Sequence, residues 1–231
     1  YPAPYHHTLK LPRQPVKGEV VTLQIYLGVN AKKAVIERDT DLLTSDEVIK
    51  HRDEVRAAVL QELQTWAKYK CFSRRPRKSA RNVIDSRFVF KWKWVKDENG
   101  EKRRVIRARM CIRGFKDRDK GHLDSYAGTS KKYSQRIVAS VAAQNGWPIA
   151  SADISKAFLQ GVTYEELHKI TGETLREVNF TLPPGLDVIS CLRKVEGFEN
   201  FDPATEVAHC DKPGTGSVDA PRAFSLKLSS I

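Results

Sequence analysis

The sequence has few cysteines and no long apolar run, and both shortages argue against whole classes of protein. Its four cysteines are widely separated and form no C-x-x-C pair, which disfavours a disulfide framework and indicates reduced thiols in an intracellular protein. His209 and Cys210 are adjacent but have no second pair at zinc spacing, which argues against a structural metal site. No apolar run approaches the roughly 20 residues of a membrane helix, and no signal peptide is visible.

What the chain has in excess is positive charge. Its 231 residues include 40 Lys+Arg against 28 Asp+Glu, a net charge of +12, while 40% hydrophobic residues are enough for a core. This length predicts one domain, or one domain with an extension. Surplus cations suit a polyanionic partner, because Lys and Arg neutralise phosphates and release counterions. Composition alone favours a nucleic-acid-binding protein only slightly over a basic protein without such a partner.

The first third of the chain predicts a linker followed by one helix. Residues 1–18 are rich in proline and basic groups, as linkers are, and residues 19–28 alternate as a strand does. The polar residues at 44–47 offer helix N-caps, and apolar residues at helical spacing follow, so we expect a helix that ends near Tyr69. The basic segment 73–81 is expected to be a loop.

The clearest local pattern is a basic β-hairpin. Residues 87–95 alternate aromatic or apolar with basic side chains, Asn-Gly at 99–100 supplies a turn, and 101–115 forms the return strand. Arg107, Arg109 and Arg113 fall at even spacing, so they share one face, where they repel one another unless an anion lies between them. This pattern favours phosphate contact, although a solvated two-sided ribbon has the same alternation.

The rest of the chain predicts three more helices and one strand. A helix is expected over 131–147, stopped by Asn-Gly, and a strand over 149–154 that leads into the segment 156–161. Further helices are expected over 163–178 and 220–228, the second with Pro221 in its first turn. The Pro/Gly-rich stretch 183–216 is expected to be irregular.

Five segments, in order and at compatible spacing, resemble the reverse transcriptase of copia-type (Pseudoviridae) LTR retrotransposons. They are VIDSRFVFKWKW…DENGE, IRARMCIRGF, AAQNGWPIASADISKAFLQG, LPPG and DAPRAFSLKL, which begin at Val83, Ile106, Ala142, Leu182 and Asp219. The resemblance implies an α+β fold: the fingers and partial palm of a right-hand polymerase, an antiparallel sheet with packed helices, truncated at the C-terminus. The domains are then a connector with a helix over 1–65 and the reverse transcriptase part over 66–231.

The resemblance implies an RNA-directed DNA polymerase that acts by two-metal nucleotidyl transfer, with Mg²⁺ or alternatively Mn²⁺. Asp153 is expected to be catalytic and, with Ile154, to hold the metal; the alternative for a lone Asp is a helix cap or a turn. Ala157 and Phe158 are expected beside the nucleotide, where the Phe158 ring excludes a 2′-OH; the alternative is an ordinary core Phe. Lys156 either adds charge there or is solvated.

Nucleic-acid contacts are expected from the hairpin and from the loop before the last helix. Lys93, Arg107 and Arg109 are candidates for gripping triphosphate or template, because guanidinium groups fit phosphate oxygens. A one-residue slip in register exchanges the faces, so the choice between Arg107 and Arg109 stays open. The family's Tyr-Gly-Leu-Lys-Gln is replaced by Thr-Gly-Ser-Val-Asp at 215–219. Template or primer contacts are expected from Arg113, Gly216, Pro221 and Arg222.

The family's paired aspartates are missing, since no Asp-Asp occurs anywhere in the sequence. We therefore expect the chain to be inactive alone, and its opening on Tyr1 suggests that it is cut from something longer. The resemblance implies an RNA template, a DNA primer and deoxynucleoside triphosphates as partners, with integrase and RNase H elsewhere in the polyprotein and no membrane. It places the chain in a cytoplasmic virus-like particle or the nucleus. Two competing hypotheses are a non-catalytic, nucleic-acid-binding relic of such an element and a basic adaptor unrelated to polymerases.

Overall fold

The computed structural model describes residues 41–150 and 153–230. The chain divides into two compact units, Tyr1–Leu42 and Leu43–Ile231. The linker expected over 1–18 and the strand expected over 19–28 lie outside the described residues. The boundary expected between residues 65 and 66 falls inside a helix of the second unit. No described helix is both long and apolar enough to cross a membrane.

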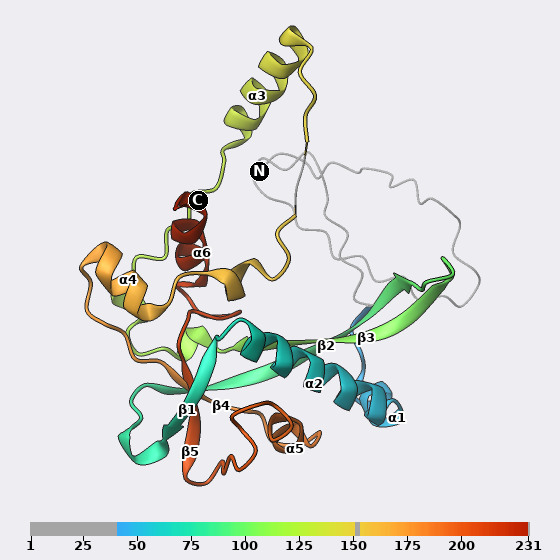
Figure 1. Cartoon of the computed structure of the whole chain (residues 1–231), viewed down its shortest axis with the longest axis vertical. Coiled ribbons are helices and arrows are strands. Elements are labelled where there is room, and N and C mark those ends of the chain that lie inside the picture. Colours follow the sequence, from blue (N-terminus) through green and yellow to red (C-terminus); the bar gives the residue numbers. More distant parts are fainter. Residues whose placement is uncertain (1–40, 151–152, 231) are drawn as a thin grey trace, which may run out of the picture. The chain divides into compact units, whose positions relative to one another are not determined.

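A five-stranded sheet organises the second unit, with the strands in the order β1-β5-β4-β2-β3 (Figure 1). The strands are β1 Phe72–Pro76, β2 Val83–Lys96, β3 Lys102–Ile112, β4 Asn179–Thr181 and β5 Glu206–Cys210. Three of the neighbouring pairs are antiparallel, whereas β2 and β4 run parallel. The sheet is therefore mixed rather than purely antiparallel, and β3 is one of its edges.

The described residues form six helices: α1 Ser45–Lys50, α2 Arg52–Lys68, α3 Lys132–Asn145, α4 Tyr164–Thr171, α5 Val188–Leu192 and α6 Ala220–Ser229. Short 3₁₀ turns cover Arg77–Ser79, Gly114–Lys116, Lys120–His122 and Ala157–Gln160. The helix expected before Tyr69 is formed as two, because His51 leaves the helical region with φ −106° and ψ 34°. Thr44 and Glu47 cap α1 reciprocally, and α2 packs along β3.

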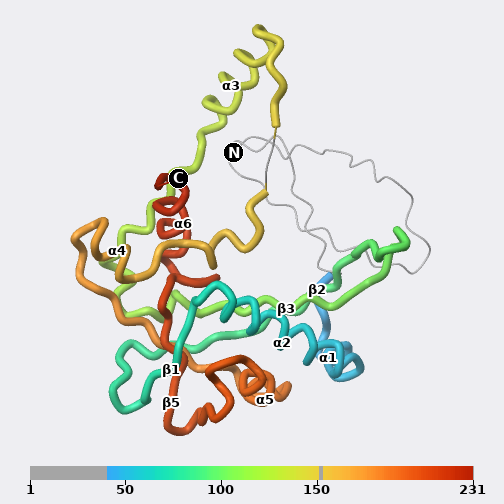
Figure 2. The backbone as a smooth tube through the Cα atoms, viewed as in Figure 1, coloured from blue at the N-terminus to red at the C-terminus, as the bar shows by residue number. Residues whose placement is uncertain are grey.

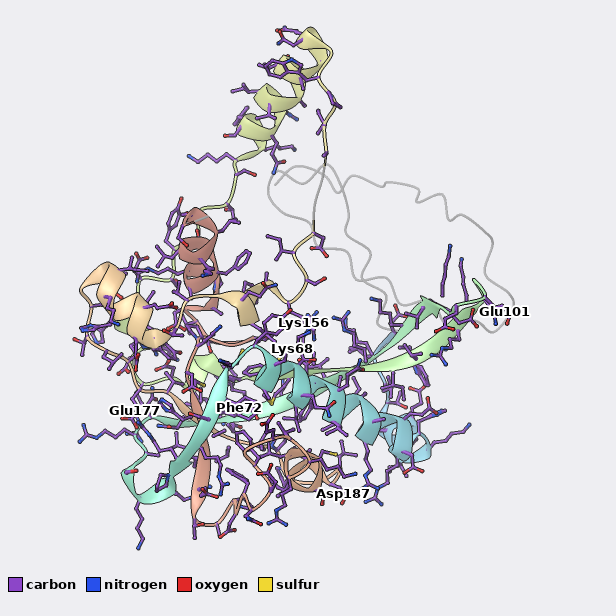
Figure 3. All side chains as sticks on the ribbon, viewed as in Figure 1. Lys68, Phe72, Glu101, Lys156, Glu177 and Asp187 are labelled. Carbon is purple, nitrogen blue, oxygen red and sulfur yellow. The ribbon has the colours of Figure 1, made fainter. Side chains whose placement is uncertain are left out.

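The predicted hairpin is confirmed as β2 and β3, which run side by side in Figure 2. Its turn is wider than two residues: Asp97 N–H donates to the Glu101 carbonyl at 2.9 Å, and Gly100 takes a positive φ of +82°. Glu101 marks the tip in Figure 3. The helices predicted around 131–147 and 220–228 are confirmed as α3 and α6, and α3 stops where Gly146 takes φ +64°.

Four sequence predictions are wrong in part. The expected loop 73–81 begins as β1, since Ser73–Pro76 backbone pairs with β5. Residues 149, 150, 153 and 154 are irregular rather than a strand, because no described strand pairs with them. The helix expected over 163–178 ends at Thr171, where Gly172 turns the chain with φ +72°. The stretch 183–216, expected to be irregular, contains α5 and β5.

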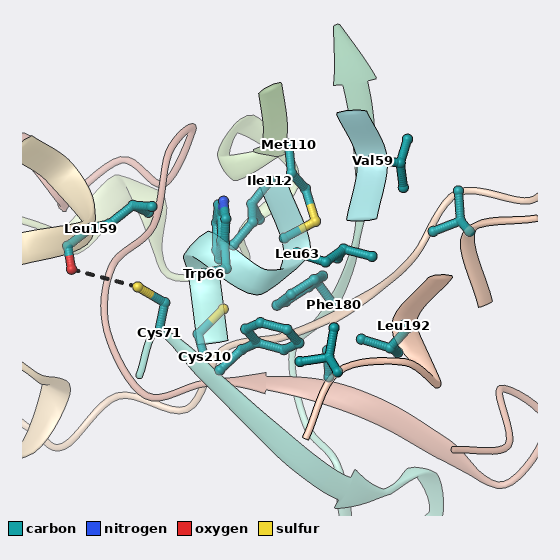
Figure 4. Packing of buried hydrophobic residues seen from close by; sticks show 14 of the residues in the cluster. Val59, Leu63, Trp66, Cys71, Met110, Ile112, Leu159, Phe180, Leu192 and Cys210 are labelled. Atoms are coloured by element: carbon teal, nitrogen blue, oxygen red, sulfur yellow. Dashed lines mark hydrogen bonds between the residues drawn. The ribbon is translucent and has the colours of Figure 1, made fainter. Parts of the chain in front are cut away.

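The core lies between α2 and the sheet (Figure 4). Trp66 of α2 is fully buried against Phe72 of β1 and Phe180 of β4, with ring centroids about 6 Å apart. Leu159 reaches the same core from the 3₁₀ turn 157–160, and the Cys71 thiol donates to its carbonyl at 3.5 Å. Burial raises the pKa of Cys71 to about 12, so the thiol stays a protonated donor. The core therefore anchors the segment that follows Asp153.

Candidate nucleic-acid interface

The two faces of the hairpin differ in what they contact. The register pairs Phe90 with Ala108 and Lys91 with Arg107, so even-numbered residues of both strands share one face and odd-numbered residues share the other. The even residues of β3 from Ile106 to Ile112 are buried beneath α2. In the part of the chain that the structure describes, no helix covers the odd face, which is exposed at its arginines and lysines. One face thus builds the core and the other meets solvent.

The odd face carries a cluster of exposed cations, which we call the basic face: Arg87, Lys91, Lys93, Arg103, Arg107 and Arg109. Among the described residues, no carboxylate forms an ion pair with any of the six. Lys91 lies directly opposite Arg107, an arrangement that costs energy unless an anion lies between the two. Arg107 and Arg109 share this exposed face, so the geometry does not separate them.

Arg113 does not belong to the basic face. It follows the last residue of β3, and its guanidinium pairs with Asp85 at 2.9 Å. Lys116 reaches the other oxygen of Asp85 at 3.0 Å. Desolvation raises the pKa of Asp85, but Lys116 and Arg113 outweigh it and hold the pKa below its usual value. The arginine expected on one face with Arg107 and Arg109 is thus neutralised at the base of the hairpin.

The segment around Asp153 is open on one side and anchored on the other. Asp153 and Ile154 are exposed and have no regular structure, contrary to the strand expected there. Phe158 lies in the 3₁₀ turn with 40% of its surface exposed, so it is not the ordinary core Phe of the alternative reading. Its neighbour Leu159 takes the core position instead, and Ala157 is half-buried.

Lys156, expected near a phosphate or in solvent, is held by a carboxylate that the sequence did not single out. Its ammonium donates to Glu62 Oε2 at 2.7 Å. Glu62 is only 4% exposed, and its other oxygen accepts from Trp66 Nε1 and from the Met110 main-chain N–H, both at 3.2 Å. Met110 lies on the edge strand β3, so this carboxylate joins α2, the hairpin and the Asp153 segment. The sequence feature that could have pointed to Glu62 is its position, as an acidic residue, on the apolar face of helix α2.

The loop before α6 packs against the end of the hairpin. Ile112 N–H donates to the Thr215 carbonyl at 2.9 Å, and Gly114 N–H donates to the Gly216 carbonyl at 3.2 Å. Gly216 has φ +94°, and a Cβ there would lie 2.2 Å from the Ile112 carbonyl oxygen, so no side chain fits. Pro221 lies in the first turn of α6, as expected. The close packing explains the glycine without requiring a nucleic-acid contact.

Arg222 is occupied within the protein. Its Nη1 donates to both Glu173 oxygens, at 2.8 and 3.0 Å, and to the Asp124 carbonyl at 3.1 Å. Nearby, Arg176, whose side chain is only 8% exposed, pairs with Asp117 and Asp219 at once, which fixes the start of α6. Burial raises the pKa of Asp219, although Arg176 opposes the shift. These arginines stabilise the fold and are not free to bind phosphate.

The described residues do not provide a complete set of ligands for the metal that the sequence resemblance implies. Among residues 41–150 and 153–230, no group of three or more His, Cys, Asp or Glu side chains could hold a metal ion. Asp153 is a single exposed carboxylate, while Mg²⁺ requires six oxygen ligands. His209 and Cys210 form no site either: the His209 ring meets Asn179 Oδ1 at 2.9 Å, and Cys210 is buried. The described residues do not fit a two-metal centre.

Comparison with known proteins finds a distant similarity to retrotransposon polyproteins. The chain is 27% identical over 147 residues to the Retrovirus-related Pol polyproteins from transposons RE2 and RE1 of Arabidopsis thaliana. The match covers 63% of this chain, which spans 8% of the length of each relative. No family model matches, and no solved structure matches. This distant similarity supports a transposon-related origin within a larger polyprotein.

Proposed function

We propose that the chain is the fingers and part of the palm of an RNA-directed DNA polymerase from a copia-type retrotransposon. The observation that carries the proposal is the basic face, six cations on two paired strands with no acidic partner among the described residues. Cations held at fixed spacing are suited to a polyphosphate backbone or a triphosphate. The similarity to retrotransposon Pol polyproteins supports nucleic acid as that partner.

Within this proposal, Lys93, Arg107 and Arg109 grip the triphosphate or the template. Their exposure and their common face allow one phosphate chain to contact all three. Phe158 stands where its ring rejects a 2′-OH, and its partly exposed position in a turn anchored by Leu159 supports that role. Ala157, with its small side chain, leaves room for the nucleotide.

Asp153 is proposed as one metal ligand, with the Ile154 main chain beside it. Because the described residues do not complete the site, we derive no chemical step through the metal, and we expect no nucleotidyl transfer from this chain alone. The chain's own residues bind and position the ligand. The basic face attracts the phosphates, Phe158 limits the sugar, and the Glu62–Lys156 pair holds the segment that carries Asp153 and Phe158.

The second candidate is a non-catalytic nucleic-acid-binding relic of the same kind of element. It is favoured by the single exposed carboxylate at 153, beside which the described residues offer no group of three or more metal-ligating side chains. The two candidates differ in whether a nucleotide affects nucleic-acid binding. A polymerase binds a primer–template more tightly when the next complementary nucleotide is present, whereas a relic binds it equally in both cases.

The test is equilibrium binding of the chain to a DNA primer on an RNA template, with Mg²⁺ and either the complementary or a mismatched deoxynucleotide. The proposed polymerase predicts tighter binding with the complementary deoxynucleotide alone, and loss of that gain in Asp153→Asn. Phe158→Ala should let the matching ribonucleotide give the same gain. Equal binding under all nucleotide conditions would favour the relic and contradict the polymerase.

A further inference from the structure

A row of aromatic side chains on the even face of the hairpin continues beyond the helices that cover it. Phe88, Phe90, Trp92 and Trp94 occupy every second position of β2. The first three pack against the core. Trp92 is also fixed from α1, since its Nε1–H donates to Glu47 Oε1 at 3.2 Å. The row is therefore anchored as far as Trp92, and Trp94 extends it toward the tip.

Trp94 is exposed and surrounded by cations on its own face. It is 62% exposed and lies directly opposite Arg104, whose Cζ is 5.9 Å from its ring centroid and 4.7 Å from that of Trp92. Lys96 and Lys102 form the next cross-strand pair on this face. Among the described residues, none of these three cations forms an ion pair. The indole is thus flanked by positive charge.

The acidic residues near the tip belong to the turn. Asp97 Oδ1 accepts from the main-chain N–H groups of Asn99 and Glu101, at 3.0 and 2.8 Å, so this carboxylate is used in closing the hairpin. Glu98 and Glu101 are exposed, and Figure 3 shows Glu101 at the end of the ribbon. A ligand that follows the paired strands from Lys96 and Lys102 toward Trp94 therefore moves away from these carboxylates.

We infer that Trp94 and Arg104 form a stacking platform for an unpaired base of a single-stranded nucleic acid, whose phosphates lie on Lys96 and Lys102. A base stacks on an exposed indole whatever its sequence, and a guanidinium against the rings adds a cation–π contact. The cations disfavour an apolar protein partner. Within residues 41–150 and 153–230, no second exposed apolar side chain accompanies Trp94 at this end of the face. The inference rests on the proposed binding of nucleic acid by the hairpin.

The experiment measures binding of the 231-residue chain to a fluorescein-labelled oligo(dT) of about 12 nucleotides by anisotropy. Trp94→Ala is compared with Trp147→Ala, a matched control because Trp147 is 61% exposed and outside the hairpin. We expect Trp94→Ala to weaken binding about tenfold and Trp147→Ala to leave it unchanged. Trp94→Phe should retain most of the affinity, and Arg104→Lys should lose part of it although its charge is kept.

A blunt DNA duplex separates stacking from charge. Its bases are paired, so we expect Trp94→Ala to leave duplex binding unchanged. Equal losses on both ligands, or equal losses in Trp94→Ala and Trp147→Ala, would overturn the inference, as would binding of polyglutamate that depends equally on Trp94.

The proposed function is tested by a separate variant: Arg107→Ala/Arg109→Ala should weaken binding of both nucleic acids. If only that variant weakens binding, the platform is wrong and the proposed function stands; if it weakens neither, the proposed function fails.

Discussion

Removing the buried carboxylate of Glu62 should loosen the segment that carries Asp153 and destabilise the protein. Glu62→Ala deprives three donors of their acceptor: the Lys156 ammonium, the Trp66 indole N–H and the Met110 main-chain N–H. Truncating one partner of a buried ion pair costs about 3–5 kcal/mol. Lys156 is 27% exposed, so water partly replaces the lost partner, and we expect the lower end, about 3 kcal/mol.

The converse variant should behave similarly. Lys156→Met leaves a charged Glu62 buried with neutral donors alone, and we expect a loss of about 2–3 kcal/mol. The double variant Glu62→Ala/Lys156→Met removes both charges together and should lose less than the sum of the single losses by about 2 kcal/mol. Such coupling separates a direct pair from two independent packing defects.

Urea denaturation gives these free energies, and hydrogen exchange at residues 157–160 reports the segment itself. For a unit of this size, about 3 kcal/mol lowers Tm by about 6–12 °C. Glu54→Ala, an exposed carboxylate on the same helix, is the control and should change stability by less than about 0.5 kcal/mol. If Glu62→Ala behaves like Glu54→Ala and leaves exchange at 157–160 unchanged, then Glu62 does not hold the segment.

Two further predictions concern pH and backbone conformation. The Arg81 N–H, with Asn179 and Arg75, lowers the pKa of Glu177 from 4.5 to about 2, so its contribution to stability is complete above pH 4.5 and is lost as pH falls toward 2. Glu177→Gln should flatten this part of the urea-midpoint profile; an unchanged slope would contradict the assignment. Gly216→Ala should cost about 3 kcal/mol, because its Cβ meets the Ile112 carbonyl, whereas Gly100→Ala, with φ +82° in open space, should cost only about 1 kcal/mol. Equal midpoints in urea would refute this difference.

The parts of the fold that the sequence predicts are those determined by local pattern. Alternation over 87–95 and the turn residues at 97–100 specify the hairpin within one stretch of chain. Strand β4 has three residues and pairs with β2 and β5, far away in sequence, so no local pattern marks it. The apolar run at 149–154 resembles a strand, but a strand requires a partner, and none pairs with it among the described residues.

The residues of the candidate site also divide into those that a local sequence pattern predicts and those that depend on distant parts of the chain. The cations of the hairpin follow from alternation, and the structure places Lys93, Arg107 and Arg109 on one exposed face. Arg113 pairs with Asp85 and Arg222 pairs with Glu173, and only folding brings these residues close together. Glu62 lies 94 residues from Lys156, so that contact could not be predicted from spacing. Side chains with free charge were predictable, whereas those neutralised by distant carboxylates were not.

The salt dependence of binding to a primer–template tests the central claim most directly. Log K for binding falls as log salt rises, and each phosphate contact makes this negative slope steeper by about 0.9. If Arg107 and Arg109 each hold one phosphate, Arg107→Ala/Arg109→Ala should reduce the steepness of the slope by about 1.8. Lys50→Ala/Lys68→Ala, which removes the same charge from α1 and α2, should lower it much less. Equal slopes for these two variants would show that the basic face binds no phosphate and would contradict the proposed function.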